Sequence, residues 1–117
     1  KRGECVWWFS QAHYMLHPNM RFREPFGLAP LESLACGCPV IAWDYGAMRE
    51  TIGNGVGWLV KTVEEFQHAV KVCSHELNWP MGEKQSKECR EWASQFSIQR
   101  MVDRYEELCI EAIEGGW

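Results

Sequence analysis

The segment between residues 13 and 42 most limits what this chain can fold into. Two short apolar runs, at 13–17 and 39–42, are separated by a polar loop and by a stretch of helical periodicity over 29–36. Gly37 ends that helix, because glycine readily takes the left-handed conformation found just after helix C-termini. A strand, a loop, a helix and a second buried strand in this order predict a parallel βαβ unit.

The rest of the chain supplies one more strand and several helices. A third apolar run lies at 56–60, and a helix capped by Thr62 follows it. Three short strands are fewer than the about five or six of a doubly wound domain. We therefore expect a partial three-layer αβα domain whose remaining strands lie upstream of Lys1. The expected helices cover 3–12, 29–36, 48–52, a stretch from 62, 80–95 and a last stretch capped by Ser97 and ended by Gly115 and Gly116.

Length and composition are those of one compact domain or of a piece of a larger one. The 117 residues are 46% hydrophobic and 24% charged, and the net charge of −4 comes from interspersed residues. The sequence has no basic stripe of the kind that binds nucleic acid. It also has no apolar run long enough to span a membrane. Because the chain has no start methionine, we expect a fragment of a longer polypeptide. We interpret 1–117 as a single domain with its site region in 1–60 and a helical part in 61–117.

The six cysteines are dispersed and form no C-x-x-C pair and no zinc-finger spacing. Cys36 and Cys38 make a C-x-C at a helix end, without a nearby histidine or third cysteine. We therefore expect reduced, packed thiols in a cytoplasmic protein, and no metal site.

Two carboxylates and a glycine loop converge at the start of the first βαβ helix. Glu24 precedes the loop, and Gly27 allows a close backbone approach to a ligand. Pro30 is expected to open the helix, with Glu32 in its first turn. The first amides of a helix lack intrahelical acceptors and carry the positive end of its dipole, which favours a phosphate in front of them. The amides expected to face a ligand are those of Phe26, Gly27, Leu28 and Ala29.

The two acids have a functional and a simpler explanation. Glu32 is placed to accept hydrogen bonds from a vicinal diol such as a ribose, and Glu24 to reach the group beyond the phosphates. Taken alone, Glu32 is more simply a helix-start charge and Glu24 a solvated loop charge. Their occurrence together, around one glycine loop at the end of a strand, favours a binding site.

This stretch resembles the E-x7-E signature of retaining glycosyltransferases with the GT-B fold, above all the "glycosyl transferases group 1" family. The matching sequence is Glu24-Pro-Phe-Gly-Leu-Ala-Pro-Leu-Glu32, followed by Ser-Leu-Ala-Cys-Gly-Cys-Pro-Val-Ile-Ala. The resemblance extends in family order over about residues 5 to 113. Its further landmarks are Asp44-Tyr-Gly-Ala-Met-Arg-Glu50, Asn54-Gly-Val-Gly-Trp-Leu-Val60 and Phe96-Ser97-Ile98.

The resemblance implies a Rossmann-like domain, the C-terminal half of a GT-B enzyme, that binds a nucleotide-sugar donor. By position, Glu32 would hold the ribose hydroxyls, and Glu24 would lie near the donor hexose as the candidate catalytic residue. The amides of Phe26, Gly27 and Leu28 would face the diphosphate and the sugar.

The implied reaction transfers a sugar from a UDP- or GDP-linked donor with retention at the anomeric carbon, by front-face attack. We expect no cofactor and no metal, because helix dipole, amides and basic side chains neutralise the leaving diphosphate, and the chain has no D-x-D motif. The acceptor would bind on a missing N-terminal domain, so the isolated piece is expected to be inactive. The resemblance also allows peripheral membrane association of the full-length enzyme.

The sequence departs from the family pattern near the first acid. Pro25 replaces the common glycine after that acid, and Asn19 replaces a serine that often follows the strand's proline. The basic pair that holds the donor phosphates lies upstream in the family. Arg21 and Arg23 are better explained as surface residues of a polar loop than as its substitutes.

Two other functions remain as alternatives. A non-catalytic interaction module would reuse the fold and place Trp7, Trp8 and Trp117 at a protein interface. A sugar phosphorylase or an inverting GT-B relative would keep the fold and change the reaction. Under the first interpretation, His13 and His17, on the first strand, are expected to pack or to line the rim rather than act as a general base.

Overall fold

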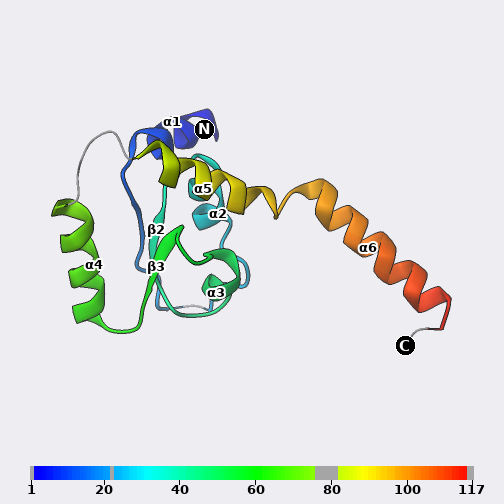
Figure 1. Cartoon of the computed structure of the whole chain (residues 1–117). Helices are drawn as coiled ribbons and strands as arrows, with labels where there is room; N and C mark the ends of the chain where they lie inside the picture. Colours follow the sequence, from blue (N-terminus) through cyan, green and yellow to red (C-terminus); the bar gives the residue numbers. More distant parts are fainter. Residues whose placement is uncertain (1, 22, 76–81, 116–117) are drawn as a thin grey trace.

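The core of the molecule is a sheet of three parallel strands with helices on both faces (Figure 1). The computed structural model describes residues 2–21, 23–75 and 82–115. The strands, in the sheet order β1–β2–β3, are β1 (Met15–His17), β2 (Val40–Trp43) and β3 (Gly57–Val60). The helices are α1 (Arg2–Gln11), α2 (Leu28–Ala35), α3 (Met48–Thr51), α4 (Val63–His75), α5 (Glu83–Ser94) and α6 (Ile98–Ile113). The predicted parallel βαβ unit is therefore confirmed.

Each strand begins one or two residues later than its apolar run. Met15 lies opposite Val40 in the register, and the Met15 N–H donates to the carbonyl of Pro39 across 2.9 Å. Proline has no N–H to give to a neighbouring strand. The ladder of β2 therefore starts at Val40 although Pro39 is itself buried.

The central strand β2 is buried on both faces and divides the core into two clusters. Its residues alternate, because successive side chains of a strand point to opposite faces. The cluster shared with α2, α3 and α5 comprises Leu34, Val40, Ala42, Met48, Ile52, Val56, Cys89 and Ala93. The cluster shared with α4 comprises Ile41, Trp43, Val60, Ala69 and Cys73. Helices on both faces make this the predicted three-layer, partial Rossmann-like arrangement.

Helix α2 begins earlier than its sequence indicates. Gly27, at φ 87°, turns the chain into the helix, and the Leu31 N–H makes the first helical bond to its carbonyl, 3.1 Å away. Pro30 is the third helical residue, where a missing N–H costs nothing. The prediction that Pro30 opens the helix and that Glu32 lies in the first turn is therefore wrong, because α2 starts at Leu28 and Glu32 falls in the second turn.

The predicted caps of the later helices are confirmed. The Thr62 hydroxyl accepts the N–H of Glu65 at 3.1 Å before α4. The Ser97 hydroxyl accepts the N–H of Arg100 at 3.3 Å before α6. The start of the helix expected at 80–95 lies outside the described residues.

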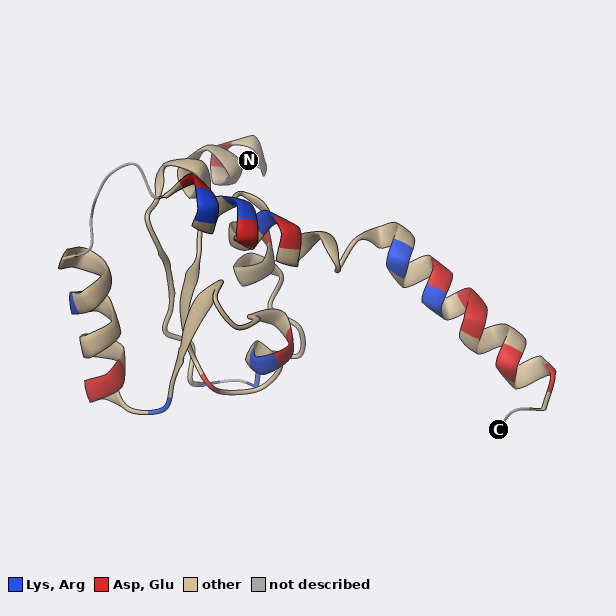
Figure 2. Cartoon of the chain, viewed as in Figure 1, with Lys and Arg blue, Asp and Glu red and all other residues tan. Residues whose placement is uncertain are grey.

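Helix α6 extends away from the rest of the molecule (Figure 1), and the molecule including α6 measures 55 × 29 × 28 Å along its principal axes. None of its residues is buried, and Ile98 and Ile113 are 78% and 84% exposed. Acidic side chains gather in its second half (Figure 2). The apolar side chains of α6 therefore have no cover in the described structure. No described helix combines the length and apolar character that crossing a membrane requires.

Helix α1 lies beside α2 and exposes two large aromatic side chains. Trp7 and Trp8 pack edge to face with 4.7 Å between ring centroids, and they are 56% and 66% exposed. Trp117, which the interaction-module alternative groups with them, lies outside the described residues.

Candidate functional site

The predicted site residues lie where the three parallel strands end. The loop after β1 carries Glu24, the loop after β2 starts at Asp44, and Lys61 directly follows β3. Strands that run parallel bring their carboxyl ends to one edge of the sheet, and ligands of open α/β sheets bind outside that edge.

The loop that carries Glu24 rests on the loop that follows β2. The Ala47 N–H donates to the Glu24 carbonyl across 2.9 Å. Gly46, at φ 63°, allows this approach, since a Cβ there would lie 2.6 Å from the same oxygen. The Arg23 guanidinium lies 5.7 Å from the centre of the Tyr45 ring, within cation–π distance. The backbone of the site loop is thus fixed from outside the loop.

The carboxylate of Glu24 folds back onto its own loop. Its Oε1 accepts the N–H of Gly27 at 3.2 Å, in a half-buried position. The sequence predicts this N–H among the donors to a ligand, whereas in the structure Glu24 holds it. The first amides of α2, those of Leu28 and Ala29, have no acceptor inside the helix.

Phe26 is anchored by residues that sequence analysis did not single out. Its carbonyl accepts the hydroxyl of Thr51, and its ring lies edge-on to Phe96 with 6.0 Å between centroids. The indole N–H of Trp92 donates to the Thr51 carbonyl across 2.9 Å. The two hydrogen bonds of Thr51 join residues that are 25 and 41 positions apart in the chain. No local sequence pattern can therefore predict them.

Glu32 is exposed on α2, beyond the loop. It lies four residues after Leu28, which corresponds to about 6 Å along the helix axis. Burial first, and then the negative charge of Glu32, raise the pKa of Cys36. The structure thus places Glu24 at the loop and Glu32 one helical turn above the free amides.

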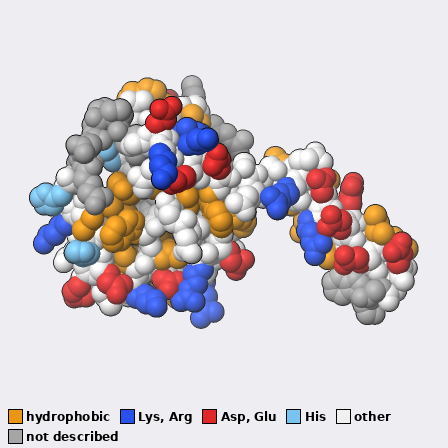
Figure 3. Space-filling view, viewed as in Figure 1, with side chains coloured by type: hydrophobic (Ala, Val, Ile, Leu, Met, Phe, Trp, Pro, Cys, Tyr) orange, Lys and Arg blue, Asp and Glu red, His pale blue; other side chains and the backbone are white. Residues whose placement is uncertain are grey.

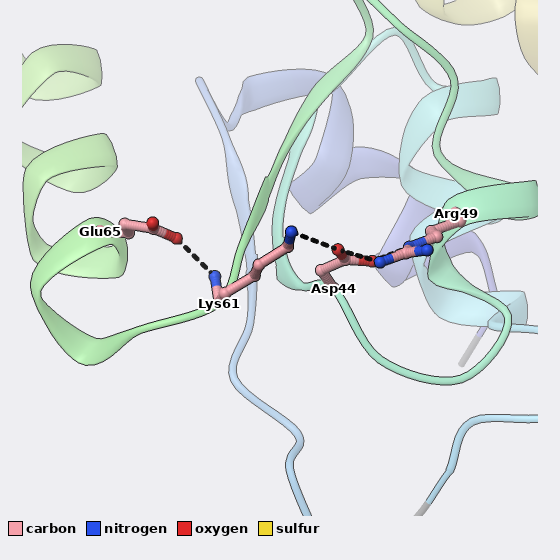
Figure 4. A network of polar contacts seen from close by, with 4 residues as sticks. All are labelled: Asp44, Arg49, Lys61 and Glu65. Atoms are coloured by element: carbon pink, nitrogen blue, oxygen red, sulfur yellow. Dashed lines mark hydrogen bonds and ion pairs between the residues drawn. The ribbon is translucent and has the colours of Figure 1, made fainter.

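A charged network joins the ends of β2 and β3 (Figure 4). Arg49 donates twice to Asp44, with Nε–Oδ1 at 2.5 Å and Nη2–Oδ2 at 2.7 Å. Lys61 Nζ lies 3.9 Å from Asp44 Oδ2, and the Lys61 N–H donates to Glu65 Oε2 at 2.6 Å. The hydrogen bonds and charge of Arg49, with the charge of Lys61, hold the pKa of Asp44 below its ordinary value.

Basic side chains are therefore available at the edge where the acids lie. The side chains of Arg49 and Lys61 are each 69% exposed, whereas that of Asp44 is 7% exposed. Figure 3 shows Lys and Arg side chains along this edge of the body, next to the loops and α3. Arg49 and Lys61 were not predicted as site neighbours, although each lies close after the end of a strand.

The histidines and cysteines contribute no cluster at this edge. Within 2–21, 23–75 and 82–115, no three His, Cys, Asp or Glu side chains come together in a way that could hold a metal ion. His13 and His17 are half-buried, and Cys38 is fully buried.

A parallel sheet with helices on both faces and a glycine-initiated helix at its carboxyl edge defines part of a Rossmann-like α/β domain. Residues 3–95 match the model of the family described as Glycosyl transferases group 1. The chain belongs to this family.

Three relatives illustrate the similarity. An alpha-1,3/1,6-mannosyltransferase ALG2 of Yarrowia lipolytica is 32% identical over 75% of this chain and 19% of its own length. An N-acetyl-alpha-D-glucosaminyl L-malate synthase of Bacillus anthracis is 31% identical over 78% of this chain and 24% of its own length. A probable sucrose-phosphate synthase of Thermosipho melanesiensis is 51% identical over 39% of this chain and 11% of its own length. The chain spans at most about a quarter of these relatives.

Proposed function

We propose that this chain forms one wall of the nucleotide-sugar donor site of a retaining glycosyltransferase. The full-length protein would transfer the sugar, a hexose, to an acceptor held by a separate N-terminal domain. The observation that carries the proposal is the position of Glu24 and Glu32 around a glycine-initiated helix at the sheet's carboxyl edge, in a member of the group 1 family.

Each part of the site has a role that its chemistry supports. The free N–H groups of Leu28 and Ala29, at the positive end of the α2 dipole, face the diphosphate. Glu32 accepts hydrogen bonds from the ribose hydroxyls. Glu24, oriented by the Gly27 N–H, lies beside the donor hexose, and the Phe26 backbone lines the approach.

The proposed reaction breaks the bond between the anomeric carbon and the diphosphate of a UDP- or GDP-linked sugar. The acceptor hydroxyl attacks from the same face, so the anomeric configuration is retained. Negative charge that develops on the leaving diphosphate is stabilised by the α2 amides and by basic groups such as Arg49 and Lys61. In this scheme a metal is not required. The free thiols of Cys5 and Cys109, both exposed, are compatible with a cytoplasmic enzyme.

Calorimetry on the full-length protein with UDP-glucose and GDP-mannose tests the proposal. We expect wild type to bind one of the two and Glu32→Gln to lose about tenfold or more in affinity, the effect of removing a charged hydrogen-bond partner. Glu64→Gln is the matched control, because Glu64 is an exposed helical carboxylate on α4. No donor binding by wild type, or equal binding by Glu32→Gln, would overturn the donor site.

Retention needs its own test, because a phosphorylase or an inverting relative shares this fold. A product assay that resolves the two anomers should show the anomer of the donor. Formation of the opposite anomer would identify an inverting enzyme, and release of a sugar phosphate from a glycan and inorganic phosphate would identify a phosphorylase.

A non-catalytic interaction module is the second candidate. The exposed rings of Trp7 and Trp8 favour it, since large apolar patches often mark protein interfaces. The same calorimetry separates the candidates, because a module needs neither donor binding nor Glu32.

A further inference from the structure

One peptide group of the site loop is held at both of its polar atoms by side chains. The carbonyl of Phe26 accepts the hydroxyl of Thr51. The N–H of Gly27, in the same peptide group, donates to Glu24 Oε1 at 3.2 Å. Because a peptide group is planar and rigid, two such bonds on opposite sides fix its orientation.

Thr51 is itself held in place. It is 1% exposed, its N–H donates to the Ala47 carbonyl at 3.0 Å, and its carbonyl accepts the indole N–H of Trp92 at 2.9 Å. A β-branched side chain has few χ1 rotamers. A helical threonine commonly donates to a carbonyl one turn earlier in its own helix, whereas Thr51 donates to a loop 25 residues away.

The clamped peptide directly precedes the start of α2. Gly27 takes φ 87° and its carbonyl accepts the first helical bond, from Leu31. The direction of the free Leu28 N–H therefore follows from the plane of the Phe26–Gly27 peptide and the turn at Gly27.

We propose that Thr51 is a positioning residue of the donor site. Its hydroxyl sets the plane of the Phe26–Gly27 peptide, and through that plane the direction in which the first amides of α2 meet the donor diphosphate. This inference rests on the proposed function, because it assigns those amides to a donor. Thr51 touches neither donor nor acceptor in this scheme.

Three variants of the full-length protein test the role. Thr51→Val keeps the shape and removes the hydroxyl, and Thr51→Ser keeps the hydroxyl. Thr62→Ala is the control for lost stability, since it removes the cap of α4 away from the loop. We expect Thr51→Val to lower affinity for the bound donor about tenfold, the equivalent of one hydrogen bond. Thr51→Ser should restore affinity to within about twofold, and Thr62→Ala should leave it unchanged.

A second measurement follows the loop without any donor. Hydrogen exchange, read by mass spectrometry on peptides covering 24–29, should be faster in Thr51→Val than in wild type, Thr51→Ser or Thr62→Ala. Unchanged exchange in Thr51→Val would show that the Thr51 hydroxyl does not hold the Phe26–Gly27 peptide in place. Faster exchange with unchanged donor affinity would overturn the positioning role. Absence of donor binding by wild type would instead overturn the proposed function. The exchange measurement alone would then decide whether Thr51 holds the Phe26–Gly27 peptide.

Discussion

Trp92 of α5 donates its indole N–H to the main-chain carbonyl of Thr51 across 2.9 Å. A Cβ at Gly53 would lie 2.5 Å from the indole ring, so the lack of a side chain at Gly53 allows the ring to come close to the backbone. The end of α5 thereby holds α3, whose Thr51 holds the site loop. A helix far along the chain thus supports the residues nearest the proposed ligand.

The hydrogen bond from the Trp92 indole to the Thr51 carbonyl should contribute to the stability of the fold. Trp92→Phe should lower the free energy of unfolding by about 1–3 kcal/mol, because a part-buried carbonyl loses its only side-chain donor among the described residues. Trp58→Phe is the control, since Trp58 is 37% exposed on β3. Urea unfolding measures both. Equal effects of the two changes would contradict the assigned role of the indole N–H.

Substitution of two glycines with positive φ distinguishes the cost of backbone strain from the cost of a steric clash. Gly46 and Gly55 have φ 63° and 87°, so alanine costs about 1–2 kcal/mol at either from conformation alone. A Cβ at Gly46 would also lie 2.6 Å from the Glu24 carbonyl oxygen, whereas at Gly55 nothing lies within 4 Å. Gly46→Ala should therefore destabilise the protein clearly more than Gly55→Ala in thermal unfolding. The reverse order would show that the loop of Glu24 yields easily.

Asp44 predicts an acid-sensitive contribution to stability. Its folded-state pKa lies below the ordinary value of 3.8, first because Arg49 donates to it. The contribution is therefore present above pH 3.8 and is lost as the pH falls through the lower, folded-state pKa. Asp44→Asn should flatten the acid limb of a plot of unfolding free energy against pH.

Asp103→Asn, on exposed α6, is the control for the acid limb. An Asp44→Asn protein with the same acid slope as wild type would show that the Asp44–Arg49 pair does not link protonation to folding.

Cys89 predicts the opposite pH dependence. Burial is the main cause that raises its pKa from 9.0 to about 12. The contribution of the protonated Cys89 thiol to the free energy of unfolding is fully present below pH 9.0. This contribution is lost as the pH rises from 9.0 toward about 12. In the native state iodoacetamide should label the exposed Cys5 and Cys109, and Cys89 only after unfolding. Rapid native labelling of Cys89 would contradict its burial.

The order and type of the elements could be predicted because they depend on local patterns. Apolar runs located three strands, and the caps at Thr62 and Ser97 located two helix starts. The start of α2 was misplaced because proline is tolerated at any position of the first turn of a helix, so Pro30 does not mark the first helical residue. The left-handed conformation of Gly27, which decides the start, is not visible in the sequence itself.

The site could be predicted only in its chain-local part. Glu24, Gly27 and Glu32 lie within nine consecutive residues, so their spacing carries a signal. Thr51 and Trp92 reach the loop by tertiary contacts alone. The bond from the Gly27 N–H to Glu24 is local, but the carbonyl of Glu24 is held by the Ala47 N–H from the loop after β2, which is again a tertiary contact.

The two-sided hold on the Phe26–Gly27 peptide has a consequence for protein engineering. A transplant of residues 23–32 into another scaffold would carry Glu24 but would leave behind the hydroxyl that orients the Phe26 carbonyl. Because the main-chain carbonyl of the same Thr51 accepts the indole N–H of Trp92, the smallest transferable unit of this loop is discontinuous and includes α3 and the end of α5. Recombination breakpoints between residues 32 and 92 should therefore separate parts that belong together.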